Sequence, residues 1–112
     1  MLPESSLRDY RTLLAAVGAI AQAIAAGDAD EAKAQYQPLP SQFQILLAAM
    51  PPPLQQSLQR YNTEIYKEIQ LLEADLMRWQ IAKQAATQQA RSQQIQQRCD
   101  RIASYIRAIL ES

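Results

Sequence analysis

The sequence predicts an all-α fold, an antiparallel helical bundle of about four helices with a long helical hairpin in its C-terminal half. Only two of the 112 residues are Gly, the residue that hairpin turns and β-bulges need for positive φ angles. Strand-forming types are also scarce, because Val17 is the only Val and Phe43 the only Phe. The helix formers Ala, Gln and Leu dominate instead. Apolar residues recur at steps of three and four, which is the period of one helix face.

Residues 1–53 are expected to form N-terminal helices with Pro-rich breaks. The first helix should begin near residues 3–6 with Ser5 or Ser6 as its N-cap, because a hydroxyl can accept a hydrogen bond from an orphan backbone N–H. It should stop at Gly27, which can adopt the left-handed cap conformation without strain. Its expected apolar face consists of Leu7, Tyr10, Leu14, Val17, Ala21 and Ile24.

A brief or bent second helix should follow this stop. Asp28 is its predicted N-cap, and Glu31 stands three residues later at the capping-box position. The prolines at positions 38 and 40 interrupt this helix, because each lacks an N–H and restricts the residue before it. Ser41 with Gln44 repeats the capping signal at the start of another short segment, which the prolines at 51–53 end.

The clearest prediction is a helical hairpin over residues 54–110. Its first helix should run from about Leu54 to about Lys83, and its second from Thr87, as the cap, to about Leu110. The first apolar stripe consists of Leu58, Tyr61, Ile65, Ile69, Leu72, Leu76 and Trp79, and the second of Ile95, Cys99, Ile102, Ile106 and Ile109 or Leu110. A short connection makes two such helices antiparallel neighbours, and residues 1–112 fit a single domain.

The chain lacks most of the residue types and motifs that catalytic sites commonly use. The chain has no His, the side chain best suited to proton transfer near neutral pH and the commonest metal ligand. Cys99 is the only cysteine, and its place on an apolar stripe predicts a buried, inert thiol. Neither a zinc cluster nor a glycine-rich phosphate loop is found. We therefore expect no enzyme activity, no cofactor and no metal site.

Charge and hydropathy predict where the protein resides and which classes of partner it does not bind. Eleven basic and eleven acidic residues give a formal net charge of +0, which provides no long-range attraction to nucleic acid or anionic lipid. The most apolar stretch, Leu13–Ala26, is shorter than the roughly 20 residues that span a bilayer. We expect a cytoplasmic protein without membrane insertion and without a nucleic-acid partner.

Two sets of residues are candidates for binding. The basic side chains predicted to meet a protein partner are Lys67, Arg78, Arg91, Arg98 and Arg101. Of these, the three from Arg91 onward share one helix face, which could meet an acidic peptide or track phosphates. Tyr66, Met77 and Ile81 lie off the main seam. Bundle partners could bury these three on a second side of the helix, or they could form a contact surface for a second copy or another protein.

From Arg60 onward the chain resembles the PatD family of small cyanobacterial proteins. The residues that carry the resemblance are Arg60-Tyr61-Asn62-Thr63-Glu64-Ile65-Tyr66-Lys67, Leu71-Leu72, Asp75, Ala82-Lys83-Gln84, Thr87, Arg91, Arg98 and Tyr105. The resemblance covers roughly positions 58 to 110. It implies a cytoplasmic regulator linked to cell division through the tubulin-like GTPase FtsZ. In filamentous cyanobacteria it also implies an influence on heterocyst frequency.

These observations leave three hypotheses for function. The first is a non-enzymatic module that binds FtsZ and modulates its assembly, with the arginine face as the docking site for an acidic surface. The second is a structural homodimer, paired through the long helix, that does not contact FtsZ. The third is a helical nucleic-acid binder, against which the zero net charge speaks.

Overall fold

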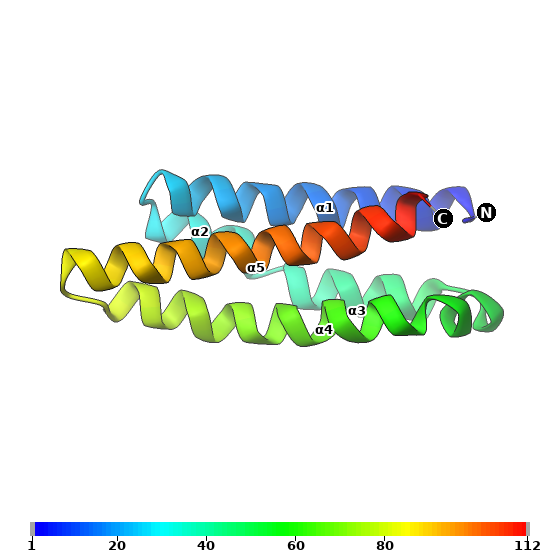
Figure 1. The fold of residues 1–112 in the computed structure, drawn as a ribbon. Coiled ribbons are helices and arrows are strands. Elements are labelled where there is room, and N and C mark those ends of the chain that lie inside the picture. Colours follow the sequence, from blue (N-terminus) through cyan, green and yellow to red (C-terminus); the bar gives the residue numbers. More distant parts are fainter. Residues whose placement is uncertain (1, 112) are drawn as a thin grey trace.

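The computed structural model describes residues 2–111, which form five helices (Figure 1). In chain order they are α1 (Glu4–Ala25), α2 (Ala29–Tyr36), α3 (Leu39–Ala49), α4 (Pro52–Ile81) and α5 (Ala85–Glu111). The described chain contains no strand. The predicted all-helical class is therefore confirmed, and so is the long C-terminal hairpin of α4 and α5.

The five helices make a four-membered bundle. α4 packs against α5, α5 against α1, α1 against both α2 and α3, and these two against α4. α2 and α3 together thus fill the fourth position, with α1 and α4 on one diagonal. α2 and α3 run in the same direction, so the four positions of the bundle alternate in direction (Figure 1). The described ends of the chain lie at the same end of the bundle, and the molecule measures 48 × 21 × 19 Å. A helical hairpin needs only short connections, which is why the chain folds back after each long helix.

The turn after α1 is built as the sequence predicted. Gly27 has a φ of +71°, its N–H donates to the Ile24 carbonyl at 3.0 Å, and the N–H of Asp28 donates to the Ala23 carbonyl at 2.9 Å. These two bonds are those of a Schellman motif, which satisfies the last carbonyls of a helix. The Asp28 side chain then accepts from the N–H of Glu31 at 3.0 Å and caps α2. One helix therefore ends where the next begins.

Three other predicted caps are wrong. α1 begins at Glu4, within the predicted range, but its N-cap is Pro3 and not Ser5 or Ser6. α3 begins at Leu39, which places Ser41 inside its first turn. α5 begins at Ala85, and the same holds for Thr87. Proline explains the first two differences, because its fixed φ favours a helix start at or beside the proline itself.

The core collects one apolar stripe from each helix. In α1 the buried set is Ser6, Tyr10, Leu13, Val17, Ile20, Ala23 and Ile24, so the stripe lies slightly round the helix from the predicted one, and Leu14 and Ala21 flank it. The predicted stripes of α4 and α5 are confirmed except at Tyr61, which is partly buried. α4 also buries three polar side chains beside its stripe, which are Asn62, Glu68 and Asp75.

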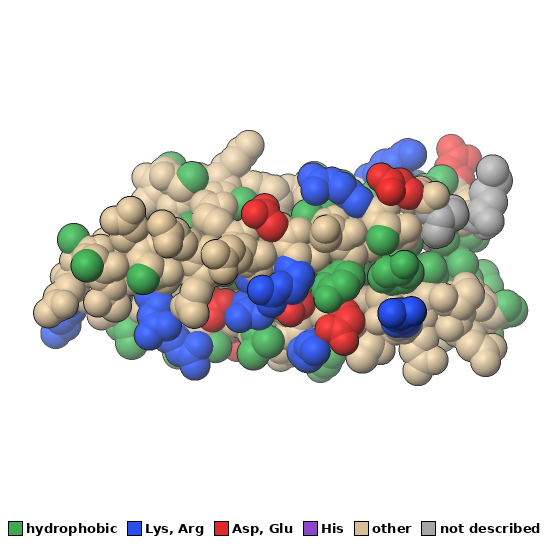
Figure 2. Space-filling view, in the orientation of Figure 1, with side chains coloured by type: hydrophobic (Ala, Val, Ile, Leu, Met, Phe, Trp, Pro, Cys, Tyr) green, Lys and Arg blue, Asp and Glu red, His purple; other side chains and the backbone are tan. Residues whose placement is uncertain are grey.

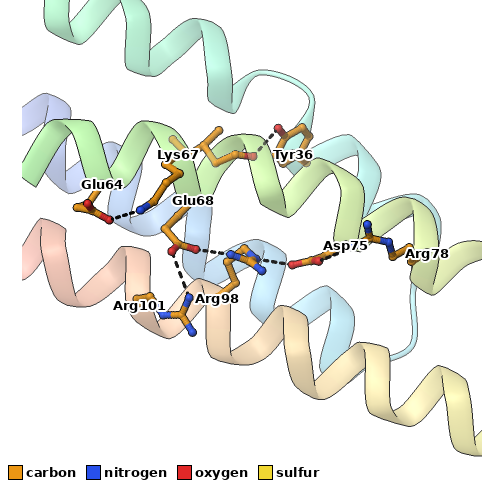
Figure 3. Close-up of polar contacts among 9 residues, drawn as sticks. Tyr36, Glu64, Lys67, Glu68, Asp75, Arg78, Arg98 and Arg101 are labelled. Carbon is orange, nitrogen blue, oxygen red and sulfur yellow. Dashed lines mark hydrogen bonds and ion pairs between the residues drawn. The ribbon is translucent and has the colours of Figure 1, made fainter.

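Polar groups inside the bundle join helices that are far apart in sequence. The buried Tyr10 hydroxyl donates to Asn62 Oδ1 at 2.6 Å, across the diagonal from α1 to α4. Tyr36 donates to the backbone carbonyl of Ile69 at 2.9 Å, from α2 to α4 (Figure 3). Burial is the main cause that raises the pKa of both phenols to about 12. Both hydroxyls therefore remain protonated donors at neutral pH.

Nothing in residues 2–111 forms a helix with the length and apolar character needed to cross a bilayer.

The Gly27 cap predicts opposite effects for the same substitution at the two glycines. Gly27→Ala should lower the free energy of unfolding by about 1 kcal/mol, because Ala is strained at positive φ. Gly18→Ala should raise it by about 0.5–1 kcal/mol, since Gly18 lies inside α1 and an added methyl would meet no atom within 4 Å. Urea denaturation of both variants measures the difference. A stabilising Gly27→Ala would contradict the role of the left-handed cap.

Candidate functional site

Basic side chains gather on the face of the bundle made by α4 and α5. Figure 2 shows Lys and Arg following these two helices, with carboxylates set between them. The close-up in Figure 3 shows four of the predicted binding residues here, with Lys67 and Arg78 from α4 and Arg98 and Arg101 from α5. We call these four residues, together with the exposed Leu71 on α4, the basic face.

Arg98 is the centre of this face and lies between two carboxylates of α4. Its Nη1 donates to Glu68 and its Nε donates to Asp75 (Figure 3). Glu68 and Asp75 are seven residues apart, so they lie on one side of α4 and about 10.5 Å apart along its axis. A planar guanidinium with donors on several edges can bridge such a pair. Arg98, one of the residues predicted to meet a partner, is therefore largely buried in this bridge.

Two further arginines complete the network from outside. Arg101 Nη1 donates to the other oxygen of Glu68 at 3.1 Å, and Arg78 Nη1 lies 3.7 Å from Asp75 Oδ1. Each buried carboxylate therefore faces two guanidinium groups. Burial alone would lower the pKa of Arg98, but its bonds to Asp75 and Glu68 outweigh that effect and raise it. The bridge stays ionised because each charge taken from water has a partner.

The network turns its negative charges inward and its positive charges outward. The side chains of Glu68 and Asp75 are 5% and 4% exposed, whereas those of Arg101 and Arg78 are 49% and 57% exposed. Arg carries five N–H donors, and these outer arginines direct only part of them at the buried acids. The outer part of each guanidinium faces solvent. The surface is therefore cationic although the whole chain has no net charge.

The other two predicted binding cations differ in their surroundings. Lys67 is exposed and pairs with Glu64 of its own helix at 2.9 Å, as expected from their spacing. Hydrogen bonding to Glu64 is the main cause that raises the pKa of Lys67. Arg91 is partly buried and donates to Gln94 at 3.1 Å. It lies two turns before Arg98 on α5 and takes no part in the network.

The three residues predicted for self-association are all exposed. Tyr66, Met77 and Ile81 are among the large apolar side chains that remain on the surface. The alternative that neighbouring helices bury them is wrong, because α4 turns them away from α5. They form a surface separate from the basic face.

Sequence reasoning missed the acidic half of the site. Glu68 and Asp75 each precede a seam residue, Ile69 and Leu76, and polar residues at such positions usually face solvent. The available signal was their spacing of seven, which repeats the heptad of the seam. Arg98 likewise precedes a buried residue, Cys99. Leu71 was also overlooked, although it lies four residues from Lys67 and seven from Arg78 on one face.

Cys99 is buried, and desolvation is the main cause that raises the pKa of its thiol to about 12. The part of the chain from 2 to 111 holds no group of three His, Cys, Asp or Glu side chains that could bind a metal ion. What this face offers a partner is therefore a set of guanidinium and ammonium donors around one apolar side chain.

Removing the central cation should leave two buried carboxylates uncompensated. Arg98→Met is expected to lower the free energy of unfolding by about 3–5 kcal/mol, measured by urea denaturation. Arg107→Met, an exposed site on the same helix, is the control and should change it by less than about 0.5 kcal/mol. Replacing all three members by apolar residues (Arg98→Met, Glu68→Met, Asp75→Leu) should recover most of the loss. Equal effects of Arg98→Met and Arg107→Met would mean that solvent screens the network.

The Cys99 thiol should react slowly in the folded protein. At pH 8 a thiol with a pKa of about 12, compared with 9.0 for the reference thiol, carries roughly a thousandfold less thiolate. An aromatic disulfide reagent should therefore react at least about a hundredfold more slowly with native protein than with protein in urea. Native and unfolded rates within a factor of two would contradict the inert thiol.

In comparisons with known proteins, no protein-family model, curated protein or solved structure matches the chain.

Proposed function

We propose that this chain is a non-enzymatic regulatory module that binds the division GTPase FtsZ through the basic face and modulates FtsZ assembly. Through FtsZ it would influence cell division, and in a filamentous cyanobacterium the frequency of heterocysts. The proposal takes its partner from the resemblance to the PatD family. It takes its docking site from the exposed cations over buried carboxylates on α4 and α5.

The observation that carries the docking site is the contrast in exposure within the network. Arg78 and Arg101 are held in place by Asp75 and Glu68 from below, which reduces the rotamer entropy they would lose on binding. Their outer N–H groups remain able to meet a carboxylate of a partner, and Arg binds carboxylates with charge-assisted bonds. A pre-positioned pair of this kind suits an acidic surface.

The remaining members of the basic face have distinct roles in this proposal. Leu71 supplies apolar contact area at the centre, since binding energy concentrates in residues that become fully desolvated. Lys67 adds charge at the rim, where it raises the rate of encounter more than the affinity. Arg98 positions the two outer arginines through the shared carboxylates and does not itself need to touch the partner.

The resemblance and the structure meet at several residues. Lys67, Leu71, Asp75 and Arg98 belong both to the pattern shared with PatD proteins and to the basic face or its buried support. This overlap supports the assignment of the family's partner to this face.

Co-sedimentation with FtsZ polymers tests the proposal. Purified FtsZ with GTP should bring the protein into the pellet, and the polymer mass should change when the protein is present. Arg78→Gln with Arg101→Gln should weaken binding by about tenfold or more, since both outer cations are lost while the buried bridge stays. Leu71→Ser should weaken it as well. Raising the salt concentration should reduce binding by the wild type.

The matched control is Arg8→Gln with Arg11→Gln, which removes two exposed cations from α1, the helix diagonally across the bundle from α4. Its binding should equal that of the wild type. Absence of the protein from the pellet together with unchanged polymer mass would refute FtsZ as the partner. Equal loss in the control and the test variant would refute the basic face as the docking site.

A further inference from the structure

The side of α4 that points away from α5 carries a second surface, with few charges, along the whole helix. We call it the outer face of α4. Its residues follow one another at steps of three and four and are Pro52, Gln55, Gln59, Asn62, Tyr66, Gln70, Glu73, Met77 and Ile81. At about 100° per residue they lie on the far side of α4 from Glu68 and Asp75, which point at α5. Only Glu73 among them is charged.

The N-terminal half of this face contains a groove with a volume of about 620 Å³. Leu47 of α3 forms one wall, and the remaining lining residues come from α4. None of the lining residues is charged. They are Leu47, Pro52, Gln55, Gln56, Gln59, Asn62, Thr63 and Tyr66.

Asn62, which lines this groove, has an unsatisfied hydrogen-bond donor. It is 6% exposed, and its Oδ1 is used by the Tyr10 hydroxyl. Its buried Nδ2 has no hydrogen-bond partner among residues 2–111. A buried donor without an acceptor destabilises a fold. The wall of the groove therefore contains one unsatisfied donor.

The C-terminal half of the outer face carries protruding apolar side chains instead. Met77 is 62% exposed and Ile81 is 75% exposed. Tyr66 lines the groove at the end nearest these residues. Met77 and Gln55 are each eleven residues from Tyr66, in opposite directions, which is about 16.5 Å along the helix axis. Ile81 is fifteen residues from Tyr66, and Pro52 is fourteen residues from it on the other side.

We propose that two copies of this chain pair antiparallel through the outer faces of their α4 helices, with Tyr66 at the two-fold axis. The equal spacing places Met77 and Ile81 of each copy over the groove of the other. A two-fold interface requires one surface that is complementary to itself, and this face carries both the projections and the matching groove.

Charge and hydrogen bonding select this direction of pairing. In a parallel pair Glu73 would face Glu73, and like charges placed opposite each other are destabilising. In the antiparallel pair Glu73 faces Gln59, because each lies seven residues from Tyr66, and the Gln59 amide can donate to it. Gln70 and Asn62 are each four residues from Tyr66. The Gln70 side chain of the second copy therefore lies at the level of Asn62 along the groove.

This pairing is separate from the proposed function. The basic face and the outer face lie on different sides of α4, so a dimer would leave both of its basic faces open. Loss of one activity without the other distinguishes the two proposals: the outer-face variants below should still co-sediment with FtsZ, and the Arg78→Gln with Arg101→Gln variant should still dimerise.

Sedimentation equilibrium over a range of concentrations tests the pairing. The wild type should show a monomer–dimer equilibrium, and Met77→Glu with Ile81→Glu should raise the dimer dissociation constant by about tenfold or more. Ile45→Glu is the matched control, because Ile45 is equally exposed, on α3, and should leave the constant unchanged. Circular dichroism should show the same helicity for all three proteins. A wild type that is monomeric throughout, or equal effects of the two variants, would overturn the proposal.

Disulfide cross-linking tests the direction of the pair. A mixture of Gln59→Cys and Glu73→Cys chains should form a cross-linked dimer under mild oxidation, whereas each variant alone should form much less. The native Cys99 is buried and should not interfere. If each variant cross-linked with itself and the mixture showed no additional cross-linking, the pair would be parallel. That result would overturn the antiparallel arrangement.

Discussion

The bridge from Arg98 to Glu68 and Asp75 is the constraint on which the arrangement of the hairpin depends. Apolar seams tolerate small slides, because one Leu or Ile can replace another against a facing helix. A buried carboxylate does not, since it would lose its counter-charge. Sliding α5 by one turn, or rotating it by one residue, would leave two acids of α4 without Arg98. Fixing the register of one helix against another is the best-attested role of buried charge. Here the bridge fixes the register of α5 against α4.

The same bridge explains how a chain without net charge presents a cationic surface. Neutrality is a sum over the molecule, but a partner meets only one side. Glu68 and Asp75 are counted in the sum and hidden from the surface, while Arg78 and Arg101 remain outside. The network therefore joins stability to recognition: the acids that hold the hairpin together also position the cations that a partner would meet.

Periodicity was enough to predict the hairpin, since the apolar stripes of α4 and α5 continue over many turns. It was less informative at helix starts, where Ser5, Ser41 and Thr87 are capping residues by type but lie inside a first turn. Prolines nearby explain the starts at Ser5 and Ser41. For the acidic half of the site the heptad spacing was a weak signal, because Glu68 and Asp75 resemble ordinary surface residues until Arg98 of another helix is placed against them. The groove was equally hidden, because its wall at Leu47 depends on how α3 meets α4.

The division of the fourth bundle position between α2 and α3 has a consequence for the dynamics of the molecule. Helices of 8 and 11 residues are too short to be stable alone in water, so both persist only through their packing on α1 and α4. Stability is uneven in such a bundle, and short, peripheral elements open before the whole chain unfolds. α2 and α3 thus form the cooperative unit of lowest local stability. Because Leu47 belongs to that unit, the groove beside α4 is a surface whose shape can fluctuate while the hairpin beneath it stays folded.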